Sequence, residues 1–90
     1  MADVTNNRDE KRFELQVEGG TALASYRLSD GRIVFTHTEV PEALEGQGIG
    51  SALVKGALDQ VRGEGLKVVP ACAFVRGYID RHAEYQDLLA

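Results

Sequence analysis

Hydrophobic and polar residues alternate along the first half of the chain, in the runs Arg12–Glu18, Ala22–Leu28 and Arg32–Val40. A period of two residues is typical of strands that bury one face. Gly19-Gly20 and Asp30-Gly31 separate the runs and are typical of tight hairpin turns. The pattern therefore predicts an antiparallel three-stranded meander.

Within the third predicted strand the alternation assigns side chains to two faces. Ile33, Phe35 and His37 fall on one face, and the residues between them on the other. His37 and Glu39 are two positions apart, so they are expected to share a face. Pro41 ends this strand because proline has no N–H to donate to a neighbouring strand.

The second half of the chain begins with a helical period. Apolar residues follow one stripe from Gly48 to Arg62, and Gly63 and Gly65 end the helix. The remaining segments are predicted as a buried strand at Leu66–Val69, a short helix at Phe74–Arg81 and a last helical turn at Glu84–Leu89. A strand joined to the next strand through a helix runs parallel to it. The order predicts an α+β fold in which the meander is extended by a parallel strand through a crossover helix, with helices packed on a mixed sheet.

The length of 90 residues allows one domain. Residues 1–11 are polar and lack periodicity, so they are predicted to form a flexible N-terminal tail before a single domain at residues 12–90. A chain of this size buries a thin core, so ligand binding or self-association can contribute to its stability. Both a monomer and a homodimer are compatible with the sequence.

The formal net charge is −4, and the only basic run is Lys11-Arg12. Nucleic-acid binding, which depends on neutralising phosphates, is therefore not expected. The longest apolar run, Val68–Val75, is far shorter than the ~20 residues that cross a bilayer. Cys72 is the single cysteine, so a disulfide or a multi-cysteine metal site is not expected either. We expect a cytoplasmic protein without a metal.

Three glycines, Gly46, Gly48 and Gly50, alternate with other residues just before the predicted helix. They leave backbone N–H groups uncovered at a helix N-terminus, which favours binding of a phosphate or diphosphate. The spacing differs from the dinucleotide-binding pattern GxGxxG, and no Gly-Lys-Ser/Thr follows as in a P-loop. From the glycines alone, a tight strand-to-helix turn without a ligand remains an alternative.

These residues resemble a known family. The segment Gly46–Leu53 is similar to the acetyl-CoA pyrophosphate loop of the GNAT superfamily of N-acetyltransferases, Arg/Gln-x-x-Gly-x-Gly/Ala, although Glu45 occupies its first position. The segments Val69–Arg76 and His82–Tyr85 resemble the very small single-domain branch, in which a strand ends in Pro-x-Cys before an aromatic-bearing helix. The resemblance covers about Phe13 to Leu89 and implies a minimal GNAT-like fold.

The resemblance implies an acetyl-CoA-dependent N-acetyltransferase that acts on an unidentified small-molecule or protein amine. The alternatives are a non-catalytic acyl-CoA-binding module and a plain interaction domain. The segments expected to bind coenzyme A are the end of the third strand and the glycine loop. Their residues are Thr38, Glu39, Val40, Gly46, Gln47, Gly48, Ile49, Gly50, Ser51 and Ala52. Lys55 either reaches a phosphate or is a solvated helix residue.

Two residues are the catalytic candidates. Cys72 follows a buried strand, at the carboxyl edge where parallel sheets place active groups. It is a nucleophile, a proton donor to the leaving thiolate, or a small buried hydrophobe. By resemblance Tyr78 is a proton donor, and otherwise it packs. His37 and Glu39 either relay a proton or are structural, and Phe74 is expected in the core.

Overall fold

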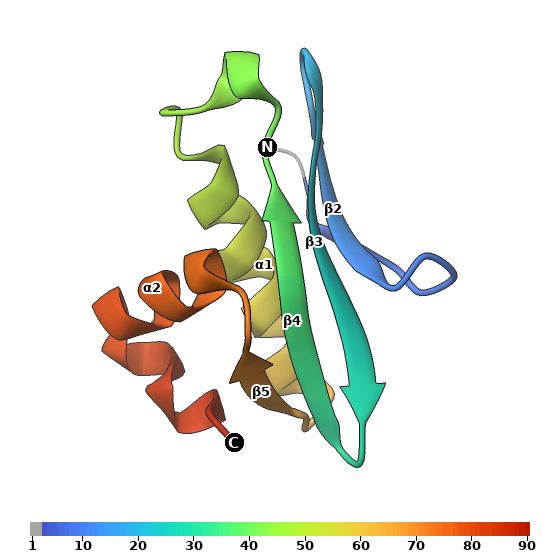
Figure 1. Cartoon of the computed structure of the whole chain (residues 1–90), viewed down its shortest axis with the longest axis vertical. Coiled ribbons are helices and arrows are strands. Elements are labelled where there is room, and N and C mark those ends of the chain that lie inside the picture. Colours follow the sequence, from blue (N-terminus) through green and yellow to red (C-terminus); the bar gives the residue numbers. More distant parts are fainter. Residues whose placement is uncertain (1–2) are drawn as a thin grey trace.

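A computed structural model describes residues 3–90 of the chain, which form a sheet with helices on one face (Figure 1). The strands are β1 (Thr5–Asn7), β2 (Arg12–Val17), β3 (Gly20–Ser29), β4 (Arg32–Glu39) and β5 (Lys67–Pro70). The helices are α1 (Ile49–Gly63) and α2 (Ala73–Arg81), with 3-10 helices η1 (Glu42–Leu44) and η2 (Ala83–Leu88).

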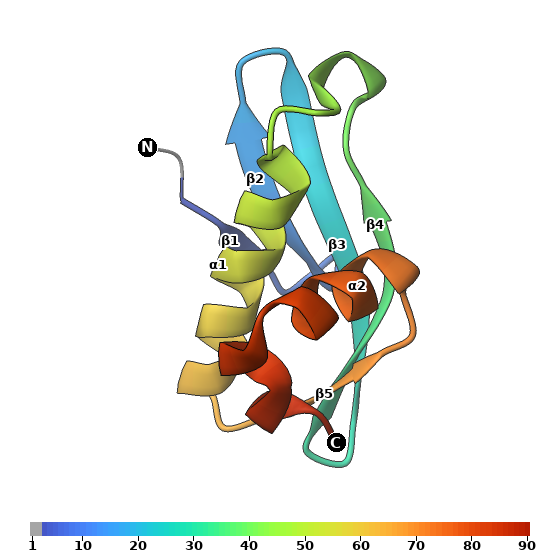
Figure 2. The same cartoon turned by 90° about the vertical axis from the view of Figure 1, so that its left-hand side faces the viewer.

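The sheet has the order β1-β2-β3-β4-β5. The first four strands are antiparallel, and β5 pairs in parallel with β4 after the crossover through α1. Both helices lie on the same face of the sheet (Figures 1 and 2). This architecture confirms the predicted α+β fold with a mixed sheet. Neither helix in residues 3–90 has the length and apolar character needed to cross a membrane.

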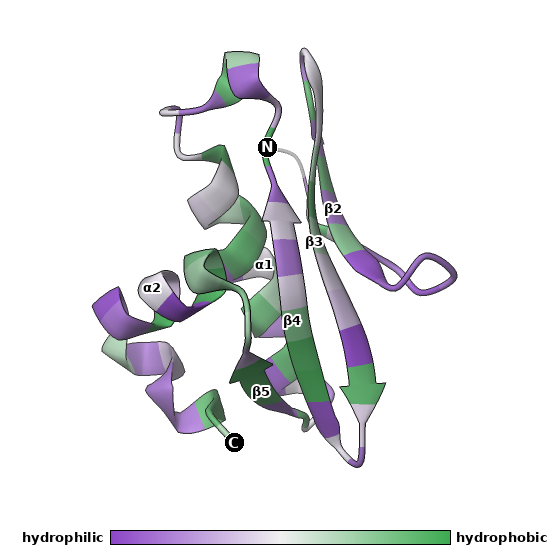
Figure 3. Ribbon diagram, in the orientation of Figure 1, coloured by the Kyte–Doolittle hydropathy of each residue, from purple (hydrophilic) through white to green (hydrophobic). Residues whose placement is uncertain are grey.

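The core lies between α1 and the sheet, as the two periodicities require. On the strands, Phe13, Ala24 and Phe35 are almost completely buried. Their partners on α1 share one stripe and are Gly50, Leu53, Val54, Ala57, Leu58 and Val61. Burying a side chain such as leucine or phenylalanine contributes about 1.5–3 kcal/mol. Figure 3 shows β5 and the middle of β4 as strongly hydrophobic, whereas the turn between β1 and β2 is hydrophilic.

The N-terminal segment differs from the predicted tail. Within residues 1–11, Thr5–Asn7 form β1 and pair with Arg12–Glu14 of β2. The prediction of a tail is therefore wrong for these three residues, and Met1 and Ala2 lie outside the described residues. The meander consequently has four antiparallel strands rather than three.

Side chains from other elements hold β1, which explains why its own sequence carries no strand pattern. The Tyr26 hydroxyl donates a hydrogen bond to Asn6 Oδ1 over 2.6 Å. Gln60 Nε2 on α1 donates to the Val4 carbonyl oxygen over 2.6 Å. The Val4 side chain lies against Gly56 of α1, where a Cβ would come within 2.4 Å of Val4 Cγ2. These contacts form only in the folded chain.

Gly56→Ala tests this docking. Alanine favours the helix by up to ~1 kcal/mol over glycine, but its methyl group would displace Val4. We expect the hydrogen-exchange protection factors of the β1 amides to fall about tenfold. This change corresponds to a decrease of ~1.4 kcal/mol in the free energy of local opening. Gly63→Ala is the matched control, because a Cβ there meets no atom within 4 Å. Equal β1 protection in both variants would contradict the proposed contact.

Candidate active site

The parallel strands β4 and β5 separate near their carboxyl ends. Their pairing runs from Arg32–Lys67 to Phe35–Pro70, whereas β4 continues to Glu39. The Cys72 N–H donates to the Phe35 carbonyl oxygen over 2.9 Å, and α2 begins one residue later. The last four residues of β4 therefore extend beyond β5 (Figure 1). This separation exposes the strand edge on which the site is built.

A β-bulge reverses the alternation of side chains in β4. Tyr26 pairs with Phe35, but the preceding Ser25 pairs with His37, so Thr36 is an additional residue on β4. Thr38 then pairs with buried Ala24 and faces the helices. Simple alternation predicts His37 on that face, and the bulge makes this prediction wrong. Bulges are common next to active sites because they change the direction of a side chain in this way.

His37 and Glu39 lie together on the opposite face of the sheet, and the predicted shared face is confirmed. His37 Nε2 is 3.0 Å from Glu39 Oε2, and both side chains are about 60% exposed (60% and 61%). Thr38, between them in sequence, faces the helices and Cys72. The end of β4 therefore presents an imidazole and a carboxylate on the open face of the sheet, and a hydroxyl group on the face covered by the helices.

The glycine loop leaves the N-terminus of α1 without a side-chain cap. Gly46 and Gly48 have positive φ angles of 85° and 76°, and a Cβ at either would meet no atom within 4 Å. Gly48 is the N-cap residue and makes no side-chain cap hydrogen bond. The first N–H groups of an α-helix have no acceptor inside the helix. Together with the positive end of the helix dipole, they form a site suited to an anion.

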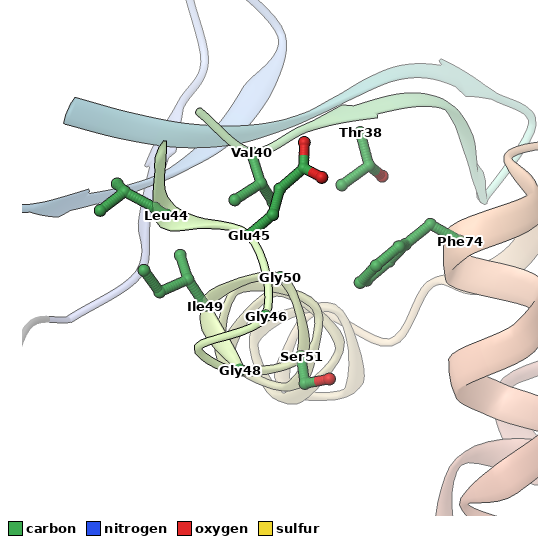
Figure 4. Close-up of a pocket in the computed structure, with 10 residues that line it drawn as sticks. All are labelled: Thr38, Val40, Leu44, Glu45, Gly46, Gly48, Ile49, Gly50, Ser51 and Phe74. Atoms are coloured by element: carbon green, nitrogen blue, oxygen red, sulfur yellow. The ribbon is translucent and has the colours of Figure 1, made fainter. Parts of the chain in front are cut away.

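A pocket of about 450 Å³ lies between the end of β4, this loop and α2 (Figure 4). Its lining residues are Thr38, Val40, Leu44, Glu45, Gly46, Gly48, Ile49, Gly50, Ser51 and Phe74. Phe74 forms a wall that contacts α1 at Gly50, where a Cβ would come within 2.5 Å of the ring atom Cζ. Phe74 was expected in the core, but it is 40% exposed, so this expectation was wrong.

Most of the residues predicted to bind the cofactor meet at this pocket, and the others lie elsewhere. Gln47 and Ala52 line a neighbouring groove on the β1 and β2 side of α1, and Glu39 faces the open side of the sheet. Leu44 and Phe74 also line the pocket but are not among the residues predicted to bind the cofactor, and Glu45 enters the prediction only as a departure from the motif. The motif position of Glu45 was the available signal, because an acidic residue there departs from the family pattern.

Cys72 lies at the N-terminus of α2, where its sulfur is 3.2 Å from Thr38 Oγ1. Partial burial by itself raises the pKa of the thiol, because it penalises the thiolate. Hydrogen bonds from Thr38 and from the backbone N–H groups of Phe74 and Val75 outweigh burial, so the pKa lies below its ordinary value. A lowered pKa increases the thiolate fraction near neutral pH.

Tyr78 lies one helical turn beyond Phe74, in a different cluster of side chains. It is 3% exposed, and its ring stacks on His82 with a centroid separation of 3.9 Å. Burial raises the pKa of its hydroxyl. Tyr78 is not among the residues that line the pocket. The structure therefore brings Cys72 next to the pocket residue Thr38 and places Tyr78 in the packing between α1, α2 and η2.

This cluster also involves Lys55, which had been a candidate phosphate ligand. Lys55 Nζ is 3.1 Å from Asp59 Oδ2, and the Tyr85 hydroxyl donates to Asp59 Oδ1 over 2.7 Å. Burial, followed by this hydrogen bond, raises the pKa of Tyr85 to about 12. The hydrogen bond from Tyr85 is also the main cause that lowers the pKa of Asp59. Lys55 and Tyr85 thus both bind the Asp59 carboxylate.

The mixed sheet, whose parallel strands separate beside a glycine-rich helix N-terminus, agrees with the minimal GNAT-like fold that the sequence resemblance implies. A family model described as GCN5-related N-acetyl-transferase matches residues 12–88. Protein NATD1 of Mus musculus is 37% identical over 79 residues, which cover 84% of this chain and 72% of that protein. Protein NATD1 of Danio rerio is 30% identical over 87 residues, covering 91% and 79%.

The fold comparison agrees with the sequence comparisons. The NMR solution structure of a GCN5-like protein from Staphylococcus aureus matches with a TM-score of 0.74 and 28% identity, covering 98% of this chain and 87% of that chain. The chain belongs to the GCN5-related N-acetyltransferase family. The predicted resemblance is therefore confirmed.

Thr38→Val tests the pKa of Cys72. A lowered pKa means that the wild-type thiol is alkylated by iodoacetamide with a midpoint at lower pH than free cysteine. Removing the Thr38 hydroxyl removes the largest of the causes that lower this pKa. We therefore expect the midpoint of the pH–rate curve to move to higher pH.

Thr36→Val is the matched control for this experiment. The Thr36 hydroxyl donates to the Ser25 carbonyl oxygen over 3.4 Å and makes no hydrogen bond to Cys72 among those found in residues 3–90. We expect its curve to match wild type. An unchanged midpoint in Thr38→Val, or an equal shift in both variants, would contradict the role of Thr38.

Proposed function

We propose that this protein is an acetyl-CoA-dependent N-acetyltransferase, in which the glycine loop holds the cofactor and Cys72 is the reactive side chain. One observation carries the proposal. The uncapped N-terminus of α1 and the Cys72 thiol, whose pKa is lowered, both lie near the point where β4 and β5 separate. Thr38 links them, because it contacts the Cys72 sulfur and also lines the pocket at the helix N-terminus. Membership of the acetyltransferase family supports the same reaction class.

The loop residues fit a diphosphate. The space in front of Gly46 and Gly48 is open, and no side chain caps the helix. The backbone N–H groups of Gln47–Ser51 would hold the diphosphate of coenzyme A, and the helix dipole adds about 0.3–1 kcal/mol at an exposed site. Glu45 extends away from these groups, toward Val40 and Thr38 (Figure 4). When bound, the cofactor supplies the acetyl group as a thioester.

Phe74 and the end of β4 would enclose the reacting groups. The Phe74 ring and Val40 form apolar walls of the pocket. In the proposal the free backbone edge of Thr38–Val40 polarises the acyl carbonyl group, because N–H donors stabilise a developing oxyanion. This edge extends beyond the last residue of β4 that pairs with β5.

Cys72 has two chemical abilities at this position. As a thiolate it would attack the acyl carbonyl carbon of acetyl-CoA, the thioester C–S bond would break and coenzyme A would leave as its thiolate, after which a neutral amine would take the acetyl group and free the Cys72 sulfur. As a thiol it would instead protonate the coenzyme A thiolate that leaves when the amine attacks the thioester directly. The lowered pKa favours the first role, because it increases the nucleophilic form. We therefore propose Cys72 as a nucleophile. Tyr78 packs in a separate cluster, and we propose no proton transfer from it.

A titration followed by NMR tests cofactor binding. We expect coenzyme A and acetyl-CoA, but not ATP, to shift the amide signals of Gly46–Ala52. Gly48→Ala should weaken binding about tenfold or more, the loss expected for one hydrogen bond to a charged group.

Gly31→Ala is the matched control for Gly48→Ala. Gly31 has a similar positive φ of 77°, a Cβ there meets no atom within 4 Å, and the residue belongs to the β3–β4 turn. Both variants should therefore carry a similar backbone strain of ~1–2 kcal/mol, but Gly31→Ala should bind coenzyme A as wild type does. Unmoved loop signals in wild-type protein would contradict the proposed function.

Intact-mass spectrometry tests the role of Cys72. After incubation with acetyl-CoA we expect the mass to increase by one acetyl group, and we expect no increase in Cys72→Ala. If an amine acceptor releases free coenzyme A without acetylation of Cys72, the nucleophile role is wrong and direct transfer replaces it. If coenzyme A binds but no thiol is released with any amine, the protein is an acyl-CoA-binding module.

A further inference from the structure

The face of the sheet opposite the helices carries apolar side chains that the core does not use. Both α-helices lie on one face, and no helix of residues 3–90 covers the other, which we call the open face (Figures 1 and 2). Leu23, Val34 and Val69 face it, because each directly follows a core residue on its strand and side chains alternate. Val34 is only 7% exposed although it lies outside the core between the sheet and α1. The open face is therefore partly apolar.

Charges of opposite sign lie at the two ends of β4 on the open face. Arg32 begins the strand, Glu39 ends it, and both are exposed. Arg27 of β3 pairs with Val34 and adds a second positive charge near the end at Arg32. At the ~3.3 Å rise per residue of a strand, the two ends of β4 are about 20 Å apart. The open face is thus positive at one end and negative at the other.

The molecule itself leaves these charges largely uncompensated. The two arginines form no ion pair among those found in residues 3–90. The partner of Glu39 is His37, and a neutral imidazole can donate a hydrogen bond without cancelling the charge of the carboxylate. On β2, Arg12 and Glu14 bind each other at 2.6 Å and add no net charge to the face. A partner of this face therefore needs a negative group at one end and a positive group at the other.

A second copy of the chain has this arrangement of charges. In an interface with twofold symmetry the same surface of both copies is used, so each contact between unlike residues occurs twice. Two sheets pack face to face about 10 Å apart with their strands nearly aligned. A twofold axis that crosses β4 midway, near Phe35 and Thr36, brings Arg32 of each copy opposite Glu39 of the other. The same packing removes Val34 of both copies from water.

We propose that this protein forms a homodimer through the open face, in which Arg32 of each copy pairs with Glu39 of the other. Four strands ~4.8 Å apart and about eight residues long present roughly 500 Å², which is small for a specific interface, so the dimer is weak. The pocket lies on the face covered by the helices, so both pockets of the dimer stay accessible. The inference does not rest on the proposed function.

Sedimentation equilibrium of the full chain tests the dimer. We expect the average mass of wild type to rise toward twice the monomer mass between about 20 µM and about 1 mM, the range in which a small interface associates. In NMR spectra recorded over the same dilution, we expect the signals of Leu23, Val34 and His37 to shift and those of Gly46–Ser51 to stay in place.

Two charge reversals test the pairing. Arg32→Glu and Glu39→Arg should each weaken self-association about tenfold or more, because two ion pairs of ~0.5–1 kcal/mol become repulsive. An equimolar mixture of the two variants should associate about as strongly as wild type, because each reversed charge then meets an opposite charge on the other chain. Both positions are exposed, so both variants should keep the fold.

Arg81→Glu is the matched control, because it makes the same change of charge at an exposed residue of α2, away from the open face. It should associate as wild type does. A wild type that stays monomeric at 1 mM, a mixture that associates no better than either variant alone, or an equal loss in Arg81→Glu and Arg32→Glu would overturn the inference. Dilution shifts confined to the helices would also overturn it, because the interface would then lie on the other face.

Discussion

The parallel pairing of β4 and β5 ends where the chain turns after Pro70, and the site depends on this ending. Backbone groups of β5 alternate in direction: the Lys67 N–H donates to Gly31 on the β4 side, whereas Val68 accepts from Ala90 on the other edge. Ala71 would be the next donor on the β4 side, but its N–H donates to the Val69 carbonyl oxygen over 3.1 Å, and the Cys72 N–H makes the last backbone hydrogen bond to β4, at Phe35. If pairing continued, a strand would cover the edge of Thr36–Glu39. Its end instead leaves room for the pocket and places Cys72 at the pocket's border.

The site combines two exposed polar features. The uncapped N-terminus of α1 leaves N–H donors that only water or a ligand can satisfy. Glu45, next to this end, is exposed to solvent and forms no ion pair among those found in residues 3–90. The open space in front of Gly46 and Gly48 therefore fits an anion-binding role better than a structural one.

The sequence predicted most of the fold, because hydrophobic periodicity reports which face of an element is buried. The strands at Phe13–Val17 and Ile33–Phe35 and the stripe of α1 follow directly from that pattern. β1 could not be predicted, because Tyr26, Gln60 and Gly56 hold it through contacts between distant segments.

The candidate site was predicted less completely, for a related reason. Glycines signal a loop by themselves, so the anion site at Gly46–Ser51 was visible in the sequence. The bulge at Thr36 was not, since one additional residue in a strand leaves no pattern of its own, and it decides that Thr38 rather than His37 faces Cys72. The exposure of Phe74 depends on how α2 packs against Gly50, which composition does not determine.

The segment that follows α2 is anchored to α1 by side-chain contacts. Beyond α2, the Tyr85 hydroxyl binds Asp59 of α1, and Arg62 of α1 binds the Asp87 carboxylate at 2.7 Å and the Glu84 carbonyl oxygen at 2.7 Å. The Tyr78 ring stacks on His82 between these anchors and Phe74. Because α2 carries Phe74 and begins at Cys72, these contacts keep the pocket wall and the thiol in place. The residues of this last segment thus support the site although none of them lines the pocket.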